Sequence, residues 1–283
     1  MTMINSYYLL TEVRSNLQEV SEAHWYDREI LRKLNQVQME LAMHLMMTPG
    51  AWILKSGSLS FSGSEAALPT DCAKPVYLEE DSSGAPIPLR INVADRRVSR
   101  LPNYTSDAVY EAWLERAKIV VNVADYSEAC TLWYHERVPD LHAGTAGASS
   151  GASALHLDAD NEPRFADDYY NNSVVEVIDQ TSGVIDISSI ISDYAGSTKV
   201  MTITGTPASG DFYGTISKLP DECYSVLVLK ATLRCLSKPS AAIDDKYYER
   251  FSAEQKDSWL TLKQWLTERA NDARHTRITE MYD

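Results

Sequence analysis

The stretch that decides the fold is DREILRKLNQVQMELAMHLMM, residues 27–47. Apolar residues recur there at helical spacing and predict an amphipathic helix with one buried face. Asp27 is expected to cap the first turn, and Tyr26 and Leu31 are expected to form a hydrophobic staple. Thr48-Pro49-Gly50 ends the helix, because proline cannot continue its hydrogen-bond ladder. The predicted buried stripe is Ile30, Leu34, Val37, Leu41 and Leu45.

Helical patterns also occur before this stretch and near the other end of the chain. A short helix is predicted around residues 10–20, and Asp221 is expected to cap a later one that ends at Lys238-Pro239-Ser240. A last helix is predicted from about Asp244 to Arg274, with a cationic end that suits the helix dipole. The apolar positions are Leu10, Val13, Leu17 and Val20 in the first helix, and Val226, Leu229, Leu233 and Leu236 in the later one.

Between these helices the apolar period changes toward two, which is typical of strands. The Ser56-Gly57 pair, flanked by apolar residues, predicts a hairpin turn. Further strands are expected at residues 76–78, 119–123 and 131–135, and short ones around residues 155–157, 174–178, 184–187 and 200–204. The predicted class is therefore α+β, with a helical bundle formed by the N- and C-terminal helices, a β-rich middle and a small all-β insert.

The run Ala143–Ala152 consists of Ala, Gly, Ser and Thr, a composition typical of flexible linkers. Residues 144–217 hold eight Asp and two Glu against Arg164 and Lys199, a balance of −8 within a net charge of −14. We therefore expect two parts: a helical core with a β layer (residues 1–143 and 218–283) and an acidic β insert (residues 144–217).

Composition excludes several classes of protein. The net charge of −14 argues against tight binding to a phosphate backbone, which needs clustered Lys and Arg. No apolar run is long enough for a transmembrane helix, and no secretory signal is predicted at the N-terminus. The four cysteines are widely spaced, which predicts reduced core thiols rather than a zinc site or disulfides.

No motif in the sequence is specific enough to indicate a catalytic, metal-binding or cofactor-binding site. We therefore expect that the chain is not an enzyme and that it binds no metal and no cofactor. Gly147-Ala148-Ser149-Ser150-Gly151 matches the nucleophile elbow formally, but no helix follows it, and a linker is the better interpretation. The acidic run at residues 158–162 lacks the glycine and distal glutamate of a calcium loop, so a solvated turn is expected. The six histidines form no metal-binding pair.

Sixteen Tyr and six Trp stand against only four Phe. Such amphipathic rings are favoured where one edge is buried and the other meets a partner. The excess of Tyr and Trp over Phe therefore favours interfaces with partner proteins.

The order of these features resembles the head-to-tail adaptor (connector) proteins of tailed bacteriophages. The run from Trp25 to Gln38 is similar to the second helix of that family, with an aromatic-Asp start and a Leu-Asn-x-x-Gln pattern. Leu68-Pro69-Thr70-Asp71 resembles the family's extended segment ending in Leu-Pro-x-Asp, and Leu219-Pro220-Asp221-Glu222 resembles the second such segment, which opens the closing helices. The resemblance spans nearly the whole chain.

The insert adds to this resemblance. Asp167–Asn172 followed by Ser192–Val200 looks like a small β module that recurs in phage virion proteins. One departure is that the module's Gly-x-Gly-x-x-Arg segment is replaced by Gln180-Thr181-Ser182-Gly183-Val184-Ile185. Any function tied to the missing arginine is therefore in doubt.

The resemblance implies a structural virion protein, assembled in the bacterial cytoplasm, that forms a homo-oligomeric ring at the portal–tail junction. Such a ring would match a twelvefold portal and bind the portal protein, tail or nozzle proteins and tail fibres. Double-stranded DNA would pass through its lumen without specific binding, and no membrane is involved. Expected interface residues are Trp25, Tyr26, Arg28, Arg32, Tyr169, Tyr170, Tyr194, Arg269, Arg274, Arg277 and Tyr282.

Two other classes of function stay open. The acidic insert could make the chain a tail-associated binding module that recognises a host glycan or a tail fibre, with Tyr169, Tyr170, Tyr194 and Tyr213 as stacking candidates. A hydrolase using Ser149 is the third class. The tail after Arg274 is short and polar, so we expect it to be disordered unless a partner captures it.

Overall fold

The computed structural model of the chain describes residues 4–19, 24–48, 52–82, 84–90, 112–121, 126, 128–237 and 245–279, without the side chains of residues 90, 245 and 269–279. The described residues combine helices with several antiparallel sheets, which confirms the mixed α+β class. None of the helices in the described part of the chain is long and apolar enough to cross a membrane.

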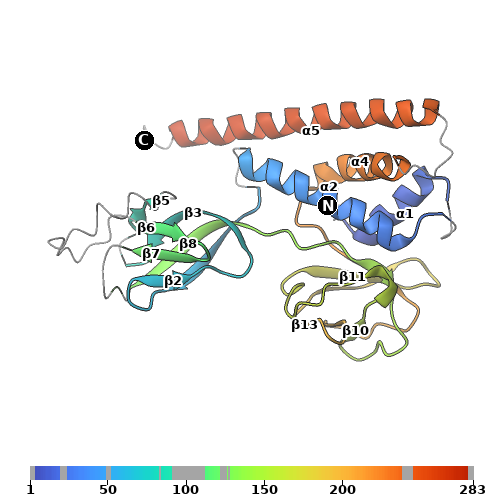
Figure 1. Cartoon of the computed structure of the whole chain (residues 1–283), viewed down its shortest axis with the longest axis horizontal. Coiled ribbons are helices and arrows are strands. Elements are labelled where there is room, and N and C mark those ends of the chain that lie inside the picture. The colour runs from blue at the N-terminus through green and yellow to red at the C-terminus, as the bar shows by residue number, and fades with distance from the viewer. Residues whose placement is uncertain are drawn as a thin grey trace. The chain divides into compact units, whose positions relative to one another are not determined.

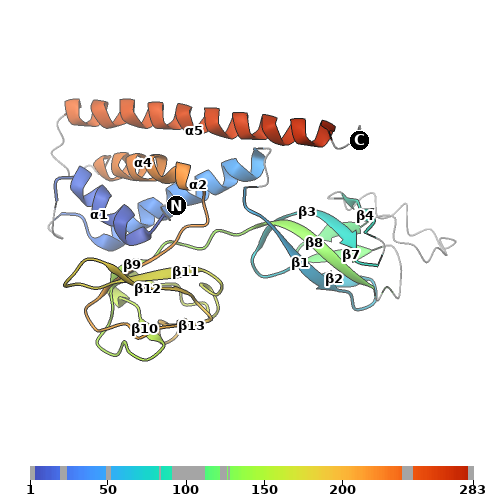
Figure 2. The ribbon, with the colours of Figure 1, turned by 180° about the vertical axis from the view of Figure 1, so that it is seen from behind.

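The chain divides into two compact units (Figures 1 and 2). Unit 1 comprises Met1–Trp52 and Val138–Asp283, and unit 2 is Ile53–Arg137. This division does not follow the boundaries predicted from the sequence. Residues 144–217 group with the helices, and the β-rich middle is the part that stands by itself.

The described residues of unit 1 include four α-helices: α1 (Ser6–Asn16), α2 (Asp27–Met47), α4 (Tyr224–Leu236) and α5 (Asp245–Thr279). Helix α4 packs against each of the other three, and Figures 1 and 2 both show α5 running alongside it. One hydrophobic cluster takes side chains from all four helices, so segments from the two ends of the sequence share a core.

Helix α2 has the predicted buried stripe, because Ile30, Leu34, Val37, Leu41 and Leu45 all lie in the core. The prediction that Asp27 caps this helix is wrong. Tyr26 occupies the cap position, and its backbone N–H donates to Glu29 Oε2 at 3.4 Å. Asp27 is the first helical residue, and its carboxylate accepts from Arg14.

The other helices differ from prediction mainly at their ends. Asn5 caps α1 by accepting from the N–H of Tyr7 at 2.8 Å, which the sequence patterns did not indicate, and α1 ends before Leu17. Asp221 opens a short 3-10 turn, η2 (Asp221–Cys223), rather than capping α4. Leu229 and Leu233 are only half-buried, and the buried face of α4 is Val226, Leu227, Val228, Ala231, Thr232, Cys235 and Leu236. Val20 and residues 238–240 lie outside the described part.

Helix α5 is longer than predicted. It continues past Arg274 to Thr279, so residues 275–279 belong to a helix and not to a disordered tail. Phe251, Leu262 and Leu266 are its buried apolar residues, at intervals that return to one face of a helix. Residues 280–283 lie outside the described part.

Residues 143–215 of unit 1 form two antiparallel sheets around one hydrophobic cluster. Strand order is β12-β11-β15-β9 in the larger sheet and β10-β14-β13 in the smaller one. The strands are β9 (Ala143–Thr145), β10 (Ala154–His156), β11 (Val174–Ile178), β12 (Ile185–Ile190), β13 (Asp193–Ala195), β14 (Val200–Thr202) and β15 (Phe212–Thr215). The short strands expected near residues 155, 174, 185 and 200 are confirmed.

The run Ala143–Ala152 is not a flexible linker. Its first residues form β9 at the edge of the larger sheet, and Ala143 and Ala146 are buried. A Cβ on Gly144 would lie 2.7 Å from the Cβ of Asp158, so a larger residue would not fit. Close packing therefore requires small residues here. The composition of the run is the same for a closely packed strand as for a flexible linker, so the sequence alone could not distinguish the two.

Buried polar contacts tie the β insert to α1, which explains why the two share a unit. Asn5 Nδ2 donates to Glu176 Oε2 at 2.7 Å, and Ser6 Oγ donates to the carbonyl of His142 at 2.7 Å. The backbone of α1 also approaches β15 closely, since a Cβ on Gly214 would lie 2.6 Å from the backbone nitrogen of Tyr7.

The described residues of unit 2 form two four-stranded sheets, ordered β1-β8-β3-β4 and β2-β7-β6-β5, whose side chains share one hydrophobic cluster. All pairings are antiparallel except that of β5 with β6. The strands are β1 (Leu54–Ser60), β2 (Glu65–Ala67), β3 (Cys72–Glu80), β4 (Pro86–Ile87), β5 (Leu89–Arg90), β6 (Ala112–Glu115), β7 (Lys118–Val121) and β8 (Ala129–Glu136).

The predicted hairpin turn at Ser56-Gly57 is wrong. Both residues lie inside β1 and pair with Trp133 and Leu132 of β8. A Cβ on Gly57 would lie 3.3 Å from the ring of Tyr134, so this glycine leaves room for a neighbouring aromatic ring rather than turning the chain. The strands predicted at residues 76–78, 119–121 and 131–135 are confirmed, and Val123 lies outside the described part.

The two Leu-Pro segments adopt the same local structure. In each, the backbone N–H of a cysteine three residues after the proline donates to the proline carbonyl, Cys72 to Pro69 at 3.0 Å and Cys223 to Pro220 at 2.9 Å. Both cysteines are buried free thiols. Each segment is thus a tight turn that leads the chain into the next strand or helix.

Candidate interaction surfaces

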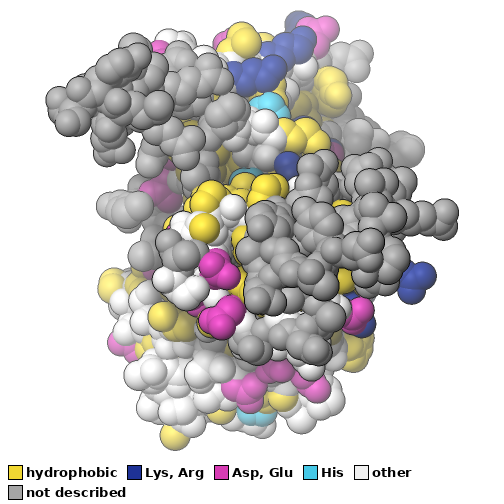
Figure 3. All heavy atoms as spheres, turned by 90° about the vertical axis from the view of Figure 1, so that its left-hand side faces the viewer, with side chains coloured by type: hydrophobic (Ala, Val, Ile, Leu, Met, Phe, Trp, Pro, Cys, Tyr) yellow, Lys and Arg dark blue, Asp and Glu magenta, His cyan; other side chains and the backbone are white. Residues whose placement is uncertain are grey.

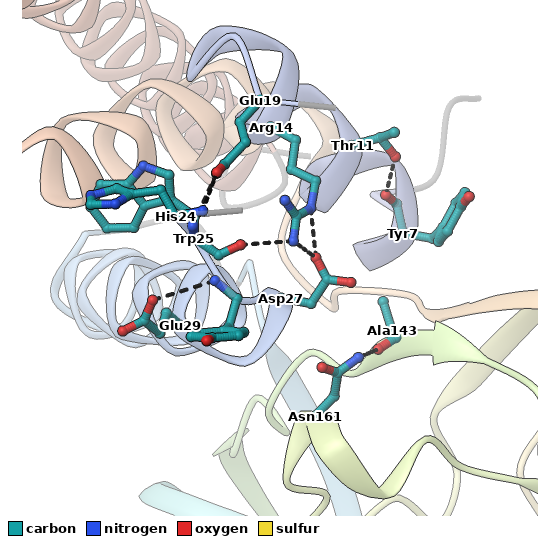
Figure 4. Close-up of polar contacts among 11 residues, drawn as sticks. Tyr7, Thr11, Arg14, Glu19, His24, Trp25, Asp27, Glu29, Ala143 and Asn161 are labelled. Carbon is teal, nitrogen blue, oxygen red and sulfur yellow. Dashed lines mark hydrogen bonds and ion pairs between the residues drawn. The ribbon is translucent and has the colours of Figure 1, made fainter. Parts of the chain in front are cut away.

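The segment that leads into α2 is held by polar contacts with α1 and the residues after it (Figure 4). Arg14 donates through Nη2 to the carbonyl of Trp25 at 3.0 Å and through Nε to the carboxylate of Asp27 at 2.6 Å. The backbone N–H of Trp25 in turn donates to Glu19 Oε2 at 3.0 Å. Trp25 is buried and Tyr26 is 50% exposed, so of this predicted pair only Tyr26 is available at the surface of the single chain.

One face of α2 carries a continuous exposed stripe. Arg28 and Arg32 begin it, and Met39, Met43 and Met47 continue it at helical spacing. The three methionines are 59%, 53% and 77% exposed, which is unusual for side chains that ordinarily fill cores. The sequence-based prediction included the two arginines and missed the methionines. The spacing of four residues between Met39, Met43 and Met47 could have indicated a second apolar face of the helix, separate from the buried stripe.

A groove of about 340 Å³ runs beside this stripe, between α2 and the 3-10 turn η1 (Ala159–Asn161) of the insert. Arg32 pairs with Glu162, which Arg28 also approaches at 3.9 Å, and Arg164 Nε donates to Asp140 Oδ2 at 2.5 Å. The hydrogen bond from Arg32 lowers the pKa of Glu162. Three guanidinium groups and two carboxylates thus line the groove, leaving it one positive charge in excess.

The back of the groove is an extended strip of chain clamped by two amides of α2. Asn35 Nδ2 donates to the carbonyl of Leu141 at 3.1 Å, and its Oδ1 accepts from the Leu141 N–H at 2.6 Å. Gln38 Nε2 donates to the carbonyl of Pro139 at 2.8 Å, and Gln38 Oε1 accepts from Ser217 Oγ at 2.7 Å. Asn35 and Gln38 are the polar residues of the Leu-Asn-x-x-Gln pattern, so this pattern has a structural role in the chain.

His142 follows the clamped strip and is buried against tyrosine rings. Its ring stacks on Tyr213, with centroids 5.8 Å apart, and Nδ1 lies 3.1 Å from the Tyr213 hydroxyl. The same hydroxyl accepts from the N–H of Asp158 at 2.7 Å, so its own hydrogen is available to His142. Burial, with a smaller contribution from the charge of Lys199, lowers the pKa of His142 to about 3 and keeps the imidazole neutral.

The tyrosines predicted as interface residues of the insert lie mostly inside it. Tyr170 and Tyr194 are buried and pack edge to face with centroids 4.8 Å apart. Tyr169 is half-buried, and its hydroxyl accepts from the backbone N–H of Asp140 at 3.3 Å. Burial raises the pKa of Tyr194 to about 12. Tyr170 and Tyr194 are therefore part of the core of the insert and are not available for stacking on a ligand.

The two motif segments of the insert interlock. The N–H of Asp168 donates to the carbonyl of Tyr194 at 2.9 Å, and the N–H of Gly196 donates to Asp167 Oδ1 at 2.8 Å. Asp168 has a φ of 62°, a left-handed conformation that Asp tolerates better than most residues. The acidic and aromatic residues of these segments therefore build the fold of the insert.

A second groove, of about 430 Å³, lies between α1, α4 and the first half of α5. Its charged residues are Glu12, Glu254 and Asp257 against Arg250, an excess of two negative charges. Arg250 pairs with Glu254 at 2.9 Å, and Tyr224 donates from its hydroxyl to Glu12. Tyr8, which is partly exposed, lies one helical turn before Glu12. Sequence reasoning did not predict this groove.

The remaining predicted interface residues are at the end of the chain. Arg269, Arg274 and Arg277 lie in α5 by their backbone, and their side chains are not described. Tyr282 lies outside the described part.

The nucleophile-elbow pattern and the acidic run are both turns. Ser149 lies in a turn that leads into strand β10, and no helix follows it. In the acidic run, Asp158 caps η1 by accepting from the N–H of Asp160 at 3.0 Å, and Asn161 donates to the carbonyl of Ala143 at 2.8 Å (Figure 4). Within the described part of the chain, no group of three His, Cys, Asp or Glu is placed to hold a metal ion.

Charged side chains are dispersed over the face drawn in Figure 3. Among the residues that the structure describes, Asp and Glu side chains lie singly or in small groups, and some Lys and Arg side chains lie together at the top of the view. Comparison of the sequence with models of known protein families and with curated proteins finds no match.

Proposed function

We propose that this chain is a head-to-tail connector of a tailed bacteriophage, which forms a ring between the portal and the tail and extends the DNA channel. The observation that carries the proposal is the clamp formed by Asn35 and Gln38 on residues 139–141. The Leu-Asn-x-x-Gln pattern on which the resemblance rests joins the second helix to the chain that leaves the β middle. The pattern therefore corresponds to a contact between two segments of the chain, which supports the proposal.

The helices supply the second support. Residues from α1, α2, α4 and α5 share one core, and we propose that they form the helical bundle that serves as the collar of the ring. The two grooves on this collar are built from different helices and carry opposite excess charges. A subunit with two unlike surfaces suits the head-to-tail contacts that close a ring.

The net charge of −14 suits passage of DNA through the ring. A lumen of the same sign as DNA does not hold the moving duplex by salt bridges. Portal protein, tail proteins and tail fibres are the proposed partners, and the virion is the proposed location.

Electron microscopy of the chain alone and mixed with the portal protein of the same phage tests the proposal. We expect closed rings seated on the portal, with DNA-channel and subunit axes aligned. A chain that stays monomeric and leaves the portal particles unchanged at micromolar concentrations would count decisively against a connector.

A binding module on the insert is the second candidate function. Burial of Tyr170, Tyr194 and Tyr213 removes three of its four stacking candidates. Phe165, which is 77% exposed with the ammonium of Lys199 over its ring at 5.5 Å, is the observation that favours it. Loss of binding to host cells or tail fibres in a Phe165→Ala variant that keeps its portal binding would support this role.

A further inference from the structure

Two exposed surfaces of unit 1 are chemically complementary. The α2 surface consists of Arg28, Arg32, Met39, Met43 and Met47. The α1–α5 surface consists of Tyr8, Glu12, Tyr224, Glu254 and Asp257, around the second groove. The grooves beside the two surfaces share no residue, so one chain presents both at once.

The two surfaces carry charges of opposite sign. Arg28 and Arg32 share one carboxylate, that of Glu162, and the side chain of Arg32 remains 62% exposed. Glu254 and Asp257 face the other groove with Arg250 as its one lining cation. Each guanidinium group retains donors for a further carboxylate, because it carries five N–H groups in a planar fork.

The uncharged parts match as well. Met39 and Met43 expose flexible thioethers one turn apart on α2, while Tyr8 and Tyr224 present aromatic rings near Glu12. Methionine sulfur packs favourably against aromatic rings, and its unbranched side chain adapts to an irregular partner surface. In the single chain the three methionines stay in water, which is costly for apolar surface of this size.

We infer that the α2 surface of one copy docks on the α1–α5 surface of a second copy, with Arg28 and Arg32 against Glu254 and Asp257 and the methionines against the tyrosines. The contact is heterologous, because the two surfaces differ, and repeated contacts of this kind close a ring or extend a filament. Antiparallel docking of the α2 surface on itself would place Arg28 and Arg32 against methionines, so these guanidinium groups would meet no carboxylate of the second copy. This inference rests on the proposed ring and names the surfaces that build it.

Disulfide trapping between two variants tests the contact even where association is weak. The four native cysteines are buried, so Met39→Cys and Tyr8→Cys each add one accessible thiol. We expect a mixture of the two variants to give a cross-linked heterodimer under mild oxidation. Met39→Cys mixed with Val184→Cys, an exposed position of the insert, is the matched control and should cross-link at least about tenfold less.

Charge reversal provides the second arm of the experiment. Arg28→Glu with Arg32→Glu, or Glu254→Lys with Asp257→Lys, should each reduce cross-linking about tenfold or more, and one reversed chain mixed with the other should restore it. Cross-linking of Met39→Cys mainly with Val184→Cys, or reversal without effect, overturns the assignment of surfaces. If rings still form on the portal with the charge-reversed chains, the connector proposal stands and the proposed contact is wrong. If cross-linking is efficient but no rings form on the portal, the contact is supported and the connector proposal is wrong.

Discussion

At the scale of single residues, glycines mark the places where two segments meet. Gly144 lies against Asp158, and Gly214 lies against the first turn of α1, each too close for a side chain. Gly151, in the same small-residue run as Gly144, has no atom near enough to obstruct a Cβ. Glycine therefore serves different purposes at positions that look alike in the sequence.

Gly214→Ala is expected to destabilise the chain by about 1–3 kcal/mol, because the added methyl group must displace the N-terminus of α1. Urea unfolding measures the change. Gly151→Ala is the control and should be neutral or slightly stabilising, since alanine reduces the entropy of the unfolded chain. Equal losses in both variants would contradict the close approach at Gly214.

His142 gives the chain an acid-sensitive contribution to stability. Its pKa in the folded chain is about 3, against an ordinary 6.5, so between these values the unfolded chain binds a proton that the folded chain does not. The free energy of unfolding therefore falls as pH falls from about 6.5 toward 3. From pH 7 to pH 5 this one group is expected to cost about 2 kcal/mol.

In His142→Asn the side-chain oxygen can still accept from the Tyr213 hydroxyl, but the protonation is removed. Urea unfolding at pH 7 and pH 5 should show a smaller loss on acidification in the variant than in the wild type. An identical pH dependence in both chains would mean that His142 does not titrate differently on folding.

At the scale of elements, α2 has three different faces. Ile30, Leu34 and Leu41 face the core, Asn35 and Gln38 hold the extended strip, and the third face is exposed. Periodicity predicted the first face because burial against one core repeats every three to four residues. The second face depends on a strip of chain about a hundred residues away, which no local pattern contains.

Asn35→Ala is expected to cost about 1–3 kcal/mol, because it leaves the N–H and the carbonyl of Leu141 without their partner. Gln36→Ala, on the exposed side of the same helix, is the control and should cost less than about 0.5 kcal/mol. Thermal or urea unfolding compares the two. A loss at Gln36 as large as that at Asn35 would show that helix propensity, and not the clamp, is responsible.

At the scale of the whole molecule, the chain leaves unit 1 and returns to it at neighbouring points. The N–H of Glu136 donates to the carbonyl of Ile53 at 2.9 Å, and Leu54 pairs with His135. The hydrophobic cluster of unit 2 draws only on residues 59–134, and that of the helices draws on none of them. Each unit thus has its own core.

Replacing residues 53–137 by a short Gly/Ser linker is expected to leave unit 1 folded, because the two ends of the excised segment lie close together and no member of its core is lost. Far-UV circular dichroism should show retained helix, and heating should give one cooperative transition. A non-cooperative transition would mean that unit 1 depends on unit 2 for its stability.

The sequence by itself determined the helices with strong apolar stripes, most of the strands and the mixed α+β class. These features follow from interactions that repeat along a short stretch of chain, and a period of 3.6 or 2 records them. The two Leu-Pro segments could be recognised in the sequence for the same reason, and each of them is a local turn.

Only the tertiary structure decided which polar and aromatic residues face inward. Tyr26 and not Asp27 is the N-cap of α2, the Asp27 carboxylate accepts from Arg14 of another helix, and Tyr170 and Tyr194 lie in a core rather than at a surface. The run from Ala143 is a packed strand because Asp158 leaves no room for larger residues. In each case the deciding partner is distant in sequence or on another element, so burial and pairing are set by the fold and leave no periodic trace in the chain.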